Sequence, residues 1–302
     1  MNKNTIVHIV LISLIIIIAG TAVFRLYRWN KSGTSDPEAD IEQIDPAEFD
    51  IETLDMIIPM DASRFEGHED DGQLQILCIG NNPFADDHGE NGLAGLIAKK
   101  TGAVVYDASF PDSIAECLKA GVFTSMESAI GYVENPEAYR PGLDTLKAVD
   151  MEKIDVILVM YDSTDYNFGT PCDNEDAPGD LSAFTGGLRY FLNTVNDTWP
   201  YIRTFVLTPT YAEYADENGG LHSGTTYDAG NGPLPYYVQK EIDAVVGCGV
   251  SIVDNYYGTI NEDNYKQYLS DHMHLNDAGR ELLAERISYI INNKMSTVKS
   301  AG

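Results

Sequence analysis

The chain has 302 residues, and its 19 Lys and Arg residues are outnumbered by 47 Asp and Glu residues, which gives a formal net charge of −28 at pH 7. This length fits one α/β domain of about 200 to 250 residues with appended segments. The hydrophobic fraction of 44% excludes a wholly disordered chain. The acidity argues against a nucleic-acid partner, because binding nucleic acids depends on Lys and Arg side chains that neutralise phosphates.

The N-terminal segment is strongly apolar. Residues 6–24 contain only three polar side chains, and at about 1.5 Å per residue a helix of this length crosses the hydrocarbon core of a bilayer. Residues 1–31 are therefore predicted to hold one uncleaved transmembrane anchor and its flanks. The alternative is a cleaved signal peptide, because Gly20-Thr21-Ala22 offers a small-residue processing site.

An acidic stretch follows at residues 32–72. It has fourteen acidic residues and one basic residue, and three prolines interrupt any helix. Such a segment repels itself and stays extended, so we expect a stalk or linker. Residues Leu54 to Met60 are apolar, and we expect them to pack on the folded domain as a strap.

Short apolar runs separated by helical stretches follow from residue 73 to residue 294, and residues 295–302 form a short tail. The runs are continuously hydrophobic, which is typical of strands covered on both faces. Alternation with helices implies βαβ units and a mainly parallel five-stranded sheet. The expected strands are 74–79, 103–106, 155–161, 202–207 and 250–253, and the expected helices are 90–100, 113–120, 181–195, 235–246 and a last helix after Asn276.

Ligands of such sheets lie beyond the carboxyl ends of the strands. The segments at those positions are Gly80-Asn81-Asn82, Asp107-Ala108-Ser109 and Asp162-Ser163-Thr164-Asp165, and Asp271-His272-Met273-His274 precedes the last helix. Their order and spacing resemble the SGNH/GDSL hydrolases over about residues 74–293. The closing Asp-x-x-His-Leu-Asn-x-x-Gly motif is matched in full by Asp271, His274, Leu275, Asn276 and Gly279.

The resemblance implies a flavodoxin-like three-layer α/β/α sandwich around a five-stranded parallel sheet. It also implies that His274 is a general base and that Asp271 orients it. A carboxylate three residues before a histidine can fix the imidazole tautomer and leave the other ring nitrogen free to take a proton. In isolation, Asp-x-x-His would more simply be the cap of a helix.

The other blocks depart from the family pattern. Asn82 stands at the position of the nucleophilic serine, Ser109 at that of the oxyanion glycine and Thr164 at that of the oxyanion asparagine. A backbone N–H at Ser109 and a hydroxyl at Thr164 still allow an oxyanion hole, and Asp165 completes the oxyanion- or substrate-binding candidates.

The amide of Asn82 is no nucleophile, and loss of the nucleophile costs a serine hydrolase about 10⁶ in kcat. Three routes remain open: His274 activates water while Asn82 holds the acyl oxygen, Ser109 or Ser113 supplies a hydroxyl, or Asp86 or Asp87 acts as a carboxylate nucleophile. The first is preferred.

The leading hypothesis is a membrane-anchored hydrolase of ester or O-acetyl groups on a cell-envelope carbohydrate or lipid. A non-catalytic module that binds glycan or protein is the alternative from another class. A third is a metal-dependent hydrolase that uses Asp86, Asp87 and His88, although a solvated loop is the simpler interpretation of these neighbours. We predict no resident cofactor and no metal site.

The orientation in the membrane has opposing indications. One Lys precedes the apolar segment, and two Arg and one Lys follow it, so the charges alone slightly favour a cytoplasmic domain. The family resemblance and the stalk favour an extracytoplasmic domain, which is our prediction. The oligomeric state is left open.

Overall fold

The computed structural model describes residues 54–66, 68, 71–115, 136–295 and 297–298. The expected membrane segment at residues 6–24, most of the stalk and most of the helix expected at residues 113–120 lie outside this part of the chain. Within the described ranges, no helix is both long enough and apolar enough to span a bilayer.

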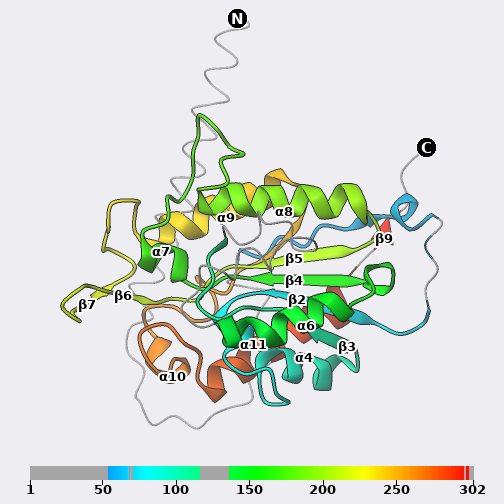
Figure 1. The fold of residues 1–302 in the computed structure, drawn as a ribbon, viewed down its shortest axis with the longest axis horizontal. Coiled ribbons are helices and arrows are strands. Elements are labelled where there is room, and N and C mark those ends of the chain that lie inside the picture. The colour runs from blue at the N-terminus through cyan, green and yellow to red at the C-terminus, as the bar shows by residue number, and fades with distance from the viewer. Residues whose placement is uncertain (1–53, 67, 69–70, 116–135, 296, 299–302) are drawn as a thin grey trace, which may run out of the picture. The chain divides into compact units, whose positions relative to one another are not determined.

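The centre of the fold is a five-stranded, all-parallel sheet in the order β3-β2-β4-β5-β8 (Figure 1). Ile76 of β2 is in register with Val156 of β4, which is in register with Arg203 of β5. The parallel sheet expected from the continuous apolar runs is confirmed. The strands are β2 (Gln75–Gly80), β3 (Val104–Asp107), β4 (Val156–Met160), β5 (Arg203–Leu207) and β8 (Ser251–Val253).

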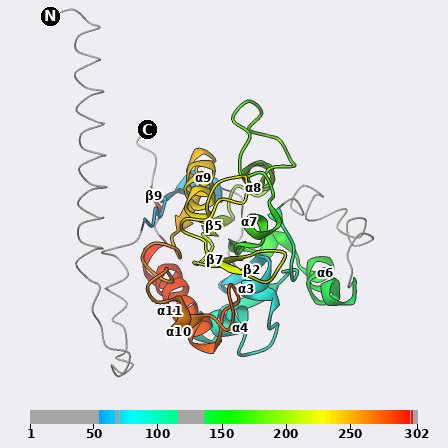
Figure 2. The same cartoon turned by 90° about the vertical axis from the view of Figure 1, so that its left-hand side faces the viewer.

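Helices cover both faces of the sheet, because alternate residues of each central strand point to opposite sides. Helices α8 (Phe184–Thr198) and α9 (Leu234–Gly247) lie on one side, and α4 (Leu93–Thr101) and α11 (Asp277–Lys294) lie on the other (Figure 2). Leu77, Ile157 and Val206 pack into the first layer, whereas Ile76, Leu158 and Phe205 pack into the second. The fold is a three-layer α/β/α sandwich.

The last helix begins where the sequence predicts. The side-chain oxygen of Asn276 accepts a hydrogen bond from the backbone N–H of Gly279 at 3.0 Å, which caps α11. Leu283, Ile287 and Ile291 are buried along the inner stripe of α11. This cap fixes the chain immediately after His274.

Several short elements have no counterpart among the predicted ones. They are the helices α3 (Asn82–Ala85), α6 (Arg140–Ala148), α7 (Thr164–Phe168) and α10 (Tyr265–Tyr268), and the 3-10 turns η2 (Ala62–Phe65), η5 (Pro136–Tyr139) and η6 (Met151–Lys153). A hairpin of β6 (Glu213–Ala215) and β7 (Leu221–Ser223) lies in the long connection after β5. Helices α3 and α7 directly follow β2 and β4, so they stand at the carboxyl edge of the sheet.

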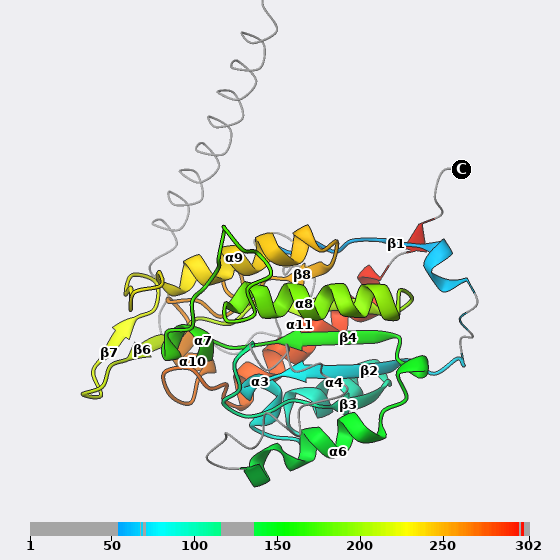
Figure 3. The same cartoon turned by 45° about the horizontal axis from the view of Figure 1, so that its top comes forward.

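The strap expected at Leu54–Met60 is confirmed. Met56 forms an antiparallel bridge with Ile252 of β8, and the backbone N–H of Leu54 donates to Asp254 at 3.0 Å. Beyond it, β1 (Met60–Asp61) pairs in parallel with β9 (Thr297–Val298). Figure 3 shows this blue segment running along the β8 side of the sheet. The strap therefore protects the edge strand of the sheet.

Candidate active site

His274 and Asp271 form a hydrogen-bonded pair in the loop before α11. The Nδ1 atom of His274 lies 2.8 Å from Oδ2 of Asp271, and Oδ1 of the same carboxylate accepts the backbone N–H of His274, also at 2.8 Å. The two side chains are 29% and 47% exposed, so solvent reaches the pair. The double contact fixes both the position and the tautomer of the imidazole, in which Nδ1 carries the hydrogen.

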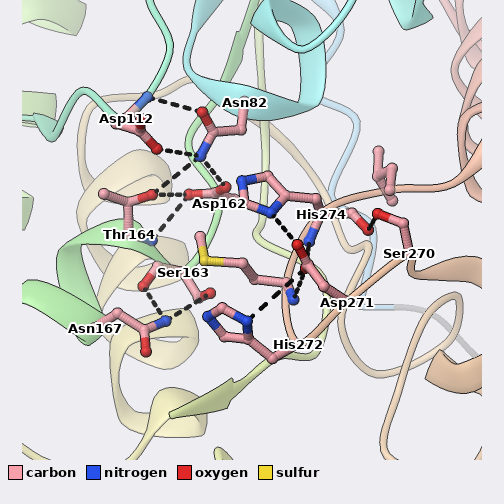
Figure 4. Close-up of polar contacts among 12 residues, drawn as sticks. Asn82, Asp112, Asp162, Ser163, Thr164, Asn167, Ser270, Asp271, His272 and His274 are labelled. Carbon is pink, nitrogen blue, oxygen red and sulfur yellow. Dashed lines mark hydrogen bonds and ion pairs between the residues drawn. The ribbon is translucent and has the colours of Figure 1, made fainter. Parts of the chain in front are cut away.

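The second ring nitrogen of His274 points across the carboxyl edge of the sheet toward Asp162 and Asn82 (Figure 4). Burial lowers the pKa of His274, but the hydrogen bond to Asp271 and the negative charges of Asp86 and Asp162 outweigh it, so the pKa is raised above its ordinary value. The pKa of Asp271 is lowered, because hydrogen bonds from two backbone amides and from His274 outweigh the effect of its burial. The two opposite pKa shifts suit His274 to accept a proton and Asp271 to stay charged and orient it.

Asn82 is the first residue of α3, directly after β2, and its side chain is 1% exposed. Its Nδ2 donates to Oδ2 of Asp162 at 2.9 Å, and its Oδ1 accepts the backbone N–H of Asp112 at 2.8 Å. Two further acceptors, Oγ1 of Thr164 and Oδ1 of Asp112, lie 3.5 Å from the same Nδ2. One amide hydrogen is therefore held firmly and the other only weakly.

Asp162 is the central acceptor of the site, and the sequence patterns did not single it out. It follows β4, is 4% exposed, and its Oδ1 accepts the side chain of Asn81 at 2.8 Å and the backbone N–H and hydroxyl of Thr164. With Asn82 on Oδ2, these donors keep a buried carboxylate satisfied. The available signal was an acidic residue directly after the central strand of a parallel sheet.

Asp112 comes from the loop after β3 and has a backbone φ of 53°, a conformation that costs energy for a residue with a side chain. This backbone presents its N–H to Asn82. The first, second and third post-strand segments thus meet around one amide, which holds Asn82 in a single orientation.

The structure separates the remaining predicted site residues. Thr164 belongs to the group around Asp162. Ser109 is fully buried, and both its backbone N–H and its hydroxyl donate to Oδ1 of Asp107. Asp165 is 1% exposed and accepts the backbone N–H of Ala115 at 3.0 Å. The structure brings together His274, Asp271, Asn82 and Thr164, and it directs Ser109 and Asp165 elsewhere.

Asp86 lies at the end of α3 and acts electrostatically on His274. Partial burial of its carboxyl, together with the charges of Asp162 and Asp112, raises the pKa of Asp86 to about 6 against the opposing effects of His274 and Arg280. His88 bonds Asp107 at 2.8 Å. Across the described ranges, no group of three or more His, Cys, Asp or Glu side chains is arranged to hold a metal ion.

The sequence matches no protein-family model. It also matches no curated protein. Solved structures from several bacteria do match the chain, at low sequence identity.

A possible lipase from Chitinophaga pinensis is 12% identical, with 74% of this chain and 99% of that chain covered and a TM-score of 0.52. A protein from Lactobacillus plantarum is 18% identical, with 73% and 98% covered and a TM-score of 0.52. A structure from Desulfitobacterium hafniense, described as a lipolytic protein of the G-D-S-L family, is 12% identical, with 72% and 99% covered and a TM-score of 0.48.

The chain shares its fold with the possible lipase from Chitinophaga pinensis. The similarity spans nearly the whole of that chain and of the Lactobacillus plantarum protein at 12% to 18% identity, so it concerns the fold. The resemblance predicted from the closing Asp271 to Gly279 motif is thereby confirmed at the level of architecture. The site residues rest on their own geometry.

Proposed function

We propose that the protein is a hydrolase of carboxylic esters or O-acetyl groups, with His274 as general base and Asp271 as its orienting carboxylate. One observation carries the proposal: Nδ1 of His274 is bonded to Asp271 at 2.8 Å while the other ring nitrogen faces the buried amide of Asn82 (Figure 4). The fold shared with a possible lipase supports the same reaction class.

Water is the nucleophile in this proposal, because Asn82 has no group that can attack. The free nitrogen of His274 takes a proton from water as the oxygen of that water bonds to the acyl carbon. The weakly held hydrogen of Asn82 Nδ2 is the donor for the developing oxyanion. When the tetrahedral intermediate collapses, the bond to the alcohol oxygen breaks and His274 returns the proton to that oxygen.

The test uses the full-length protein with short-chain p-nitrophenyl esters and acetylated sugars. His274→Ala is expected to lower kcat/KM by about 10²-fold or more, which is the usual contribution of a general base. The matched control is His222→Ala, because His222 forms a similar pair with Asp216 at 2.9 Å on the β6–β7 hairpin. Equal activity of the His274 variant and the wild type would refute the mechanism.

A second candidate function is a module that binds glycan or protein without catalysis. The observation that favours it is the complete burial of Asn82 among Asp162, Asp112 and Thr164, with the nearby hydroxyl of Ser109 committed to Asp107. Asn82→Ser separates the two. Esterase activity that appears only in this variant would favour the binding module, and activity of the wild type that depends on His274 would exclude it.

The apolar segment at residues 6–24 and the acidic stalk support a protein tethered to the membrane with its domain outside the cytoplasm. An ester or acetyl group on a cell-envelope carbohydrate or lipid is the substrate within reach of such a domain. Protease added to intact cells should digest the domain. Digestion only after lysis would contradict this location.

A further inference from the structure

Two carboxylic acids are buried on the side of the sheet covered by α8 and α9. Asp165, in α7, is 1% exposed, and Glu241, in α9, is fully buried. In the same apolar layer, the ring of Tyr166 in α7 packs edge to face against that of Tyr237 in α9, with centroids 5.7 Å apart, and the side chain of Cys172 lies there too. The proposed catalytic scheme uses neither acid, so their burial needs a separate explanation.

Most oxygens of the two acids have no donor. Oδ2 of Asp165 accepts the backbone N–H of Ala115 at 3.0 Å, and the side chain of Thr170 also acts on this carboxyl as a hydrogen-bond donor. Oδ1 of Asp165 and both carboxyl oxygens of Glu241 have no hydrogen-bond partner among the described residues. A buried carboxylate without donors or a counter-ion is strongly disfavoured, whereas the neutral acid is much less so. This environment therefore favours a bound proton on each side chain.

The titratable groups that face the two acids add negative charge or none. Asp165 is influenced by Asp162, Glu241 is influenced by Asp165, and both acids influence Cys172. Asp165 also acts on Tyr237. Lys240 and Arg189, which also lie on α9 and α8, contact the carboxylate of Asp173 at 3.3 Å and 2.9 Å.

Burial is the main influence on both acids. It raises the pKa of Asp165 to about 7, against the opposing hydrogen bonds from Ala115 and Thr170. Burial, followed by the charge of Asp165, raises the pKa of Glu241 well above its ordinary value.

We propose that Asp165 and Glu241 form a buried proton-binding pair that holds α7 against α9 while both are neutral and loosens that contact when they become charged. When the two side chains lose their protons, the resulting carboxylates need water or a cation to stabilise their charge. Water reaches them only if the contact between α7 and α9 opens. The pair is thus a switch that responds to rising pH.

The switch is connected to the candidate site through two contacts. Helix α7 begins at Thr164, whose backbone N–H and hydroxyl bond Asp162. Ala115, whose backbone N–H bonds Asp165, lies three residues after Asp112, the backbone partner of Asn82. Movement of α7 would disturb both groups that orient Asn82. The stability effect does not depend on the proposed hydrolase function, but the effect on the site does.

The sign of the stability effect follows from proton binding. Both acids have a higher pKa in the folded state than in the unfolded chain, so the native protein holds more protons and loses stability as the pH rises. Each group increases the unfolding equilibrium constant by up to about tenfold per pH unit above roughly pH 4.5. For Asp165 this increase ends near pH 7, and for Glu241 it ends at the raised pKa of that side chain.

The experiment is urea unfolding of the full-length protein between pH 5 and pH 9. The unfolding constant of the wild type, divided by that of Glu241→Gln, should rise with pH by up to about tenfold per unit. The control is Glu217→Gln, which makes the same replacement of a carboxyl by an amide in an exposed loop and should leave this ratio nearly constant. A ratio that is equally flat for both variants overturns the proposal.

A second measurement does not depend on whether Glu241→Gln folds. With ¹³C-labelled Asp and Glu, the side-chain carboxyl carbons of the wild-type protein report each titration directly. One Asp signal should titrate at about pH 7 and vanish in Asp165→Asn, and one Glu signal should titrate well above the ordinary glutamate range. If no Glu signal titrates well above that range, no buried proton-binding pair exists.

Discussion

Replacing Arg286 by Met is the most severe test of how the strap is attached. Arg286 lies in α11 and is fully buried. Its guanidinium bonds both carboxylate oxygens of Asp55 in the strap, the hydroxyl of Thr259 at 3.0 Å and the backbone carbonyl of Asp254 at 2.9 Å. The methionine keeps much of the aliphatic stem but none of the donors, so the carboxylate of Asp55 loses its guanidinium partner.

Removing one partner of a buried ion pair costs about 3 to 5 kcal/mol, because the other charge is left in a site of low polarity. For a domain of this size, each kcal/mol lowers Tm by about 2 to 4 °C. We therefore expect Tm to fall by about 6 to 20 °C in Arg286→Met. Asp55→Asn should also be strongly destabilising, because it leaves the fully buried guanidinium of Arg286 without a counter-charge.

Thermal and urea unfolding of the full-length protein measure this loss. The control is Arg140→Met, which breaks the exposed pair between Arg140 and Glu137, whose side chains are 63% and 75% exposed. Exposed pairs contribute little, so this variant should unfold like the wild type. If Arg286→Met were as stable as Arg140→Met, the strap would not depend on its buried ion pair.

The remaining predictions concern the candidate site and its supports. Because the pKa of His274 is raised, kcat/KM should increase with pH, and the pH at half its plateau should lie above the ordinary pKa of histidine. Asp271→Asn should lower that midpoint. A wild-type midpoint at or below pH 6.5 contradicts the role of His274 as general base. Gly80→Ala should lower the free energy of unfolding in urea by about 3 kcal/mol or more, because Gly80 has φ 145° and an added Cβ would lie 1.8 Å from the carbonyl oxygen of Met160. Gly102→Ala should lower it by about 1 to 2 kcal/mol, because Gly102 has φ 72° but an added Cβ would meet nothing within 4 Å. Similar losses in the two variants would refute the steric argument. Asn276→Ala should lower the free energy of unfolding by about 1 to 2 kcal/mol, measured by thermal unfolding, because the cap of α11 is lost. Asn276→Ser should lower it less, because a serine hydroxyl can also cap a helix. Equal losses in the two variants would show that the cap contributes nothing.

The sheet and the longest helices were predictable because their signals are local. The central strand β4 is a short, uninterrupted apolar run, and β5 is apolar from Phe205 on, since both faces of the sheet are covered by helices. The start of α11 was predictable because Asn276, a residue of the closing motif, also caps the helix. These features need only neighbouring residues to be recognised.

The short helices α3 and α7 were not predictable, because four or five residues carry no periodic pattern and form no stable helix alone. Tertiary contacts hold them in place. Asn82 in α3 is bonded to Asp162, 80 positions away along the chain. Ala115 is bonded to Asp165 of α7 across 50 positions.

The sequence by itself determined the layered α/β architecture, the resemblance to a hydrolase fold and the pairing of His274 with Asp271, because these depend on residue patterns within a few positions. Only the tertiary structure decided that Asp162 is the central acceptor around Asn82, that Ser109 turns toward Asp107 and that Asp165 and Glu241 share one buried layer. The physical reason is that side-chain direction and burial are set by which strands become neighbours. A parallel sheet makes neighbours of segments that are far apart in the chain.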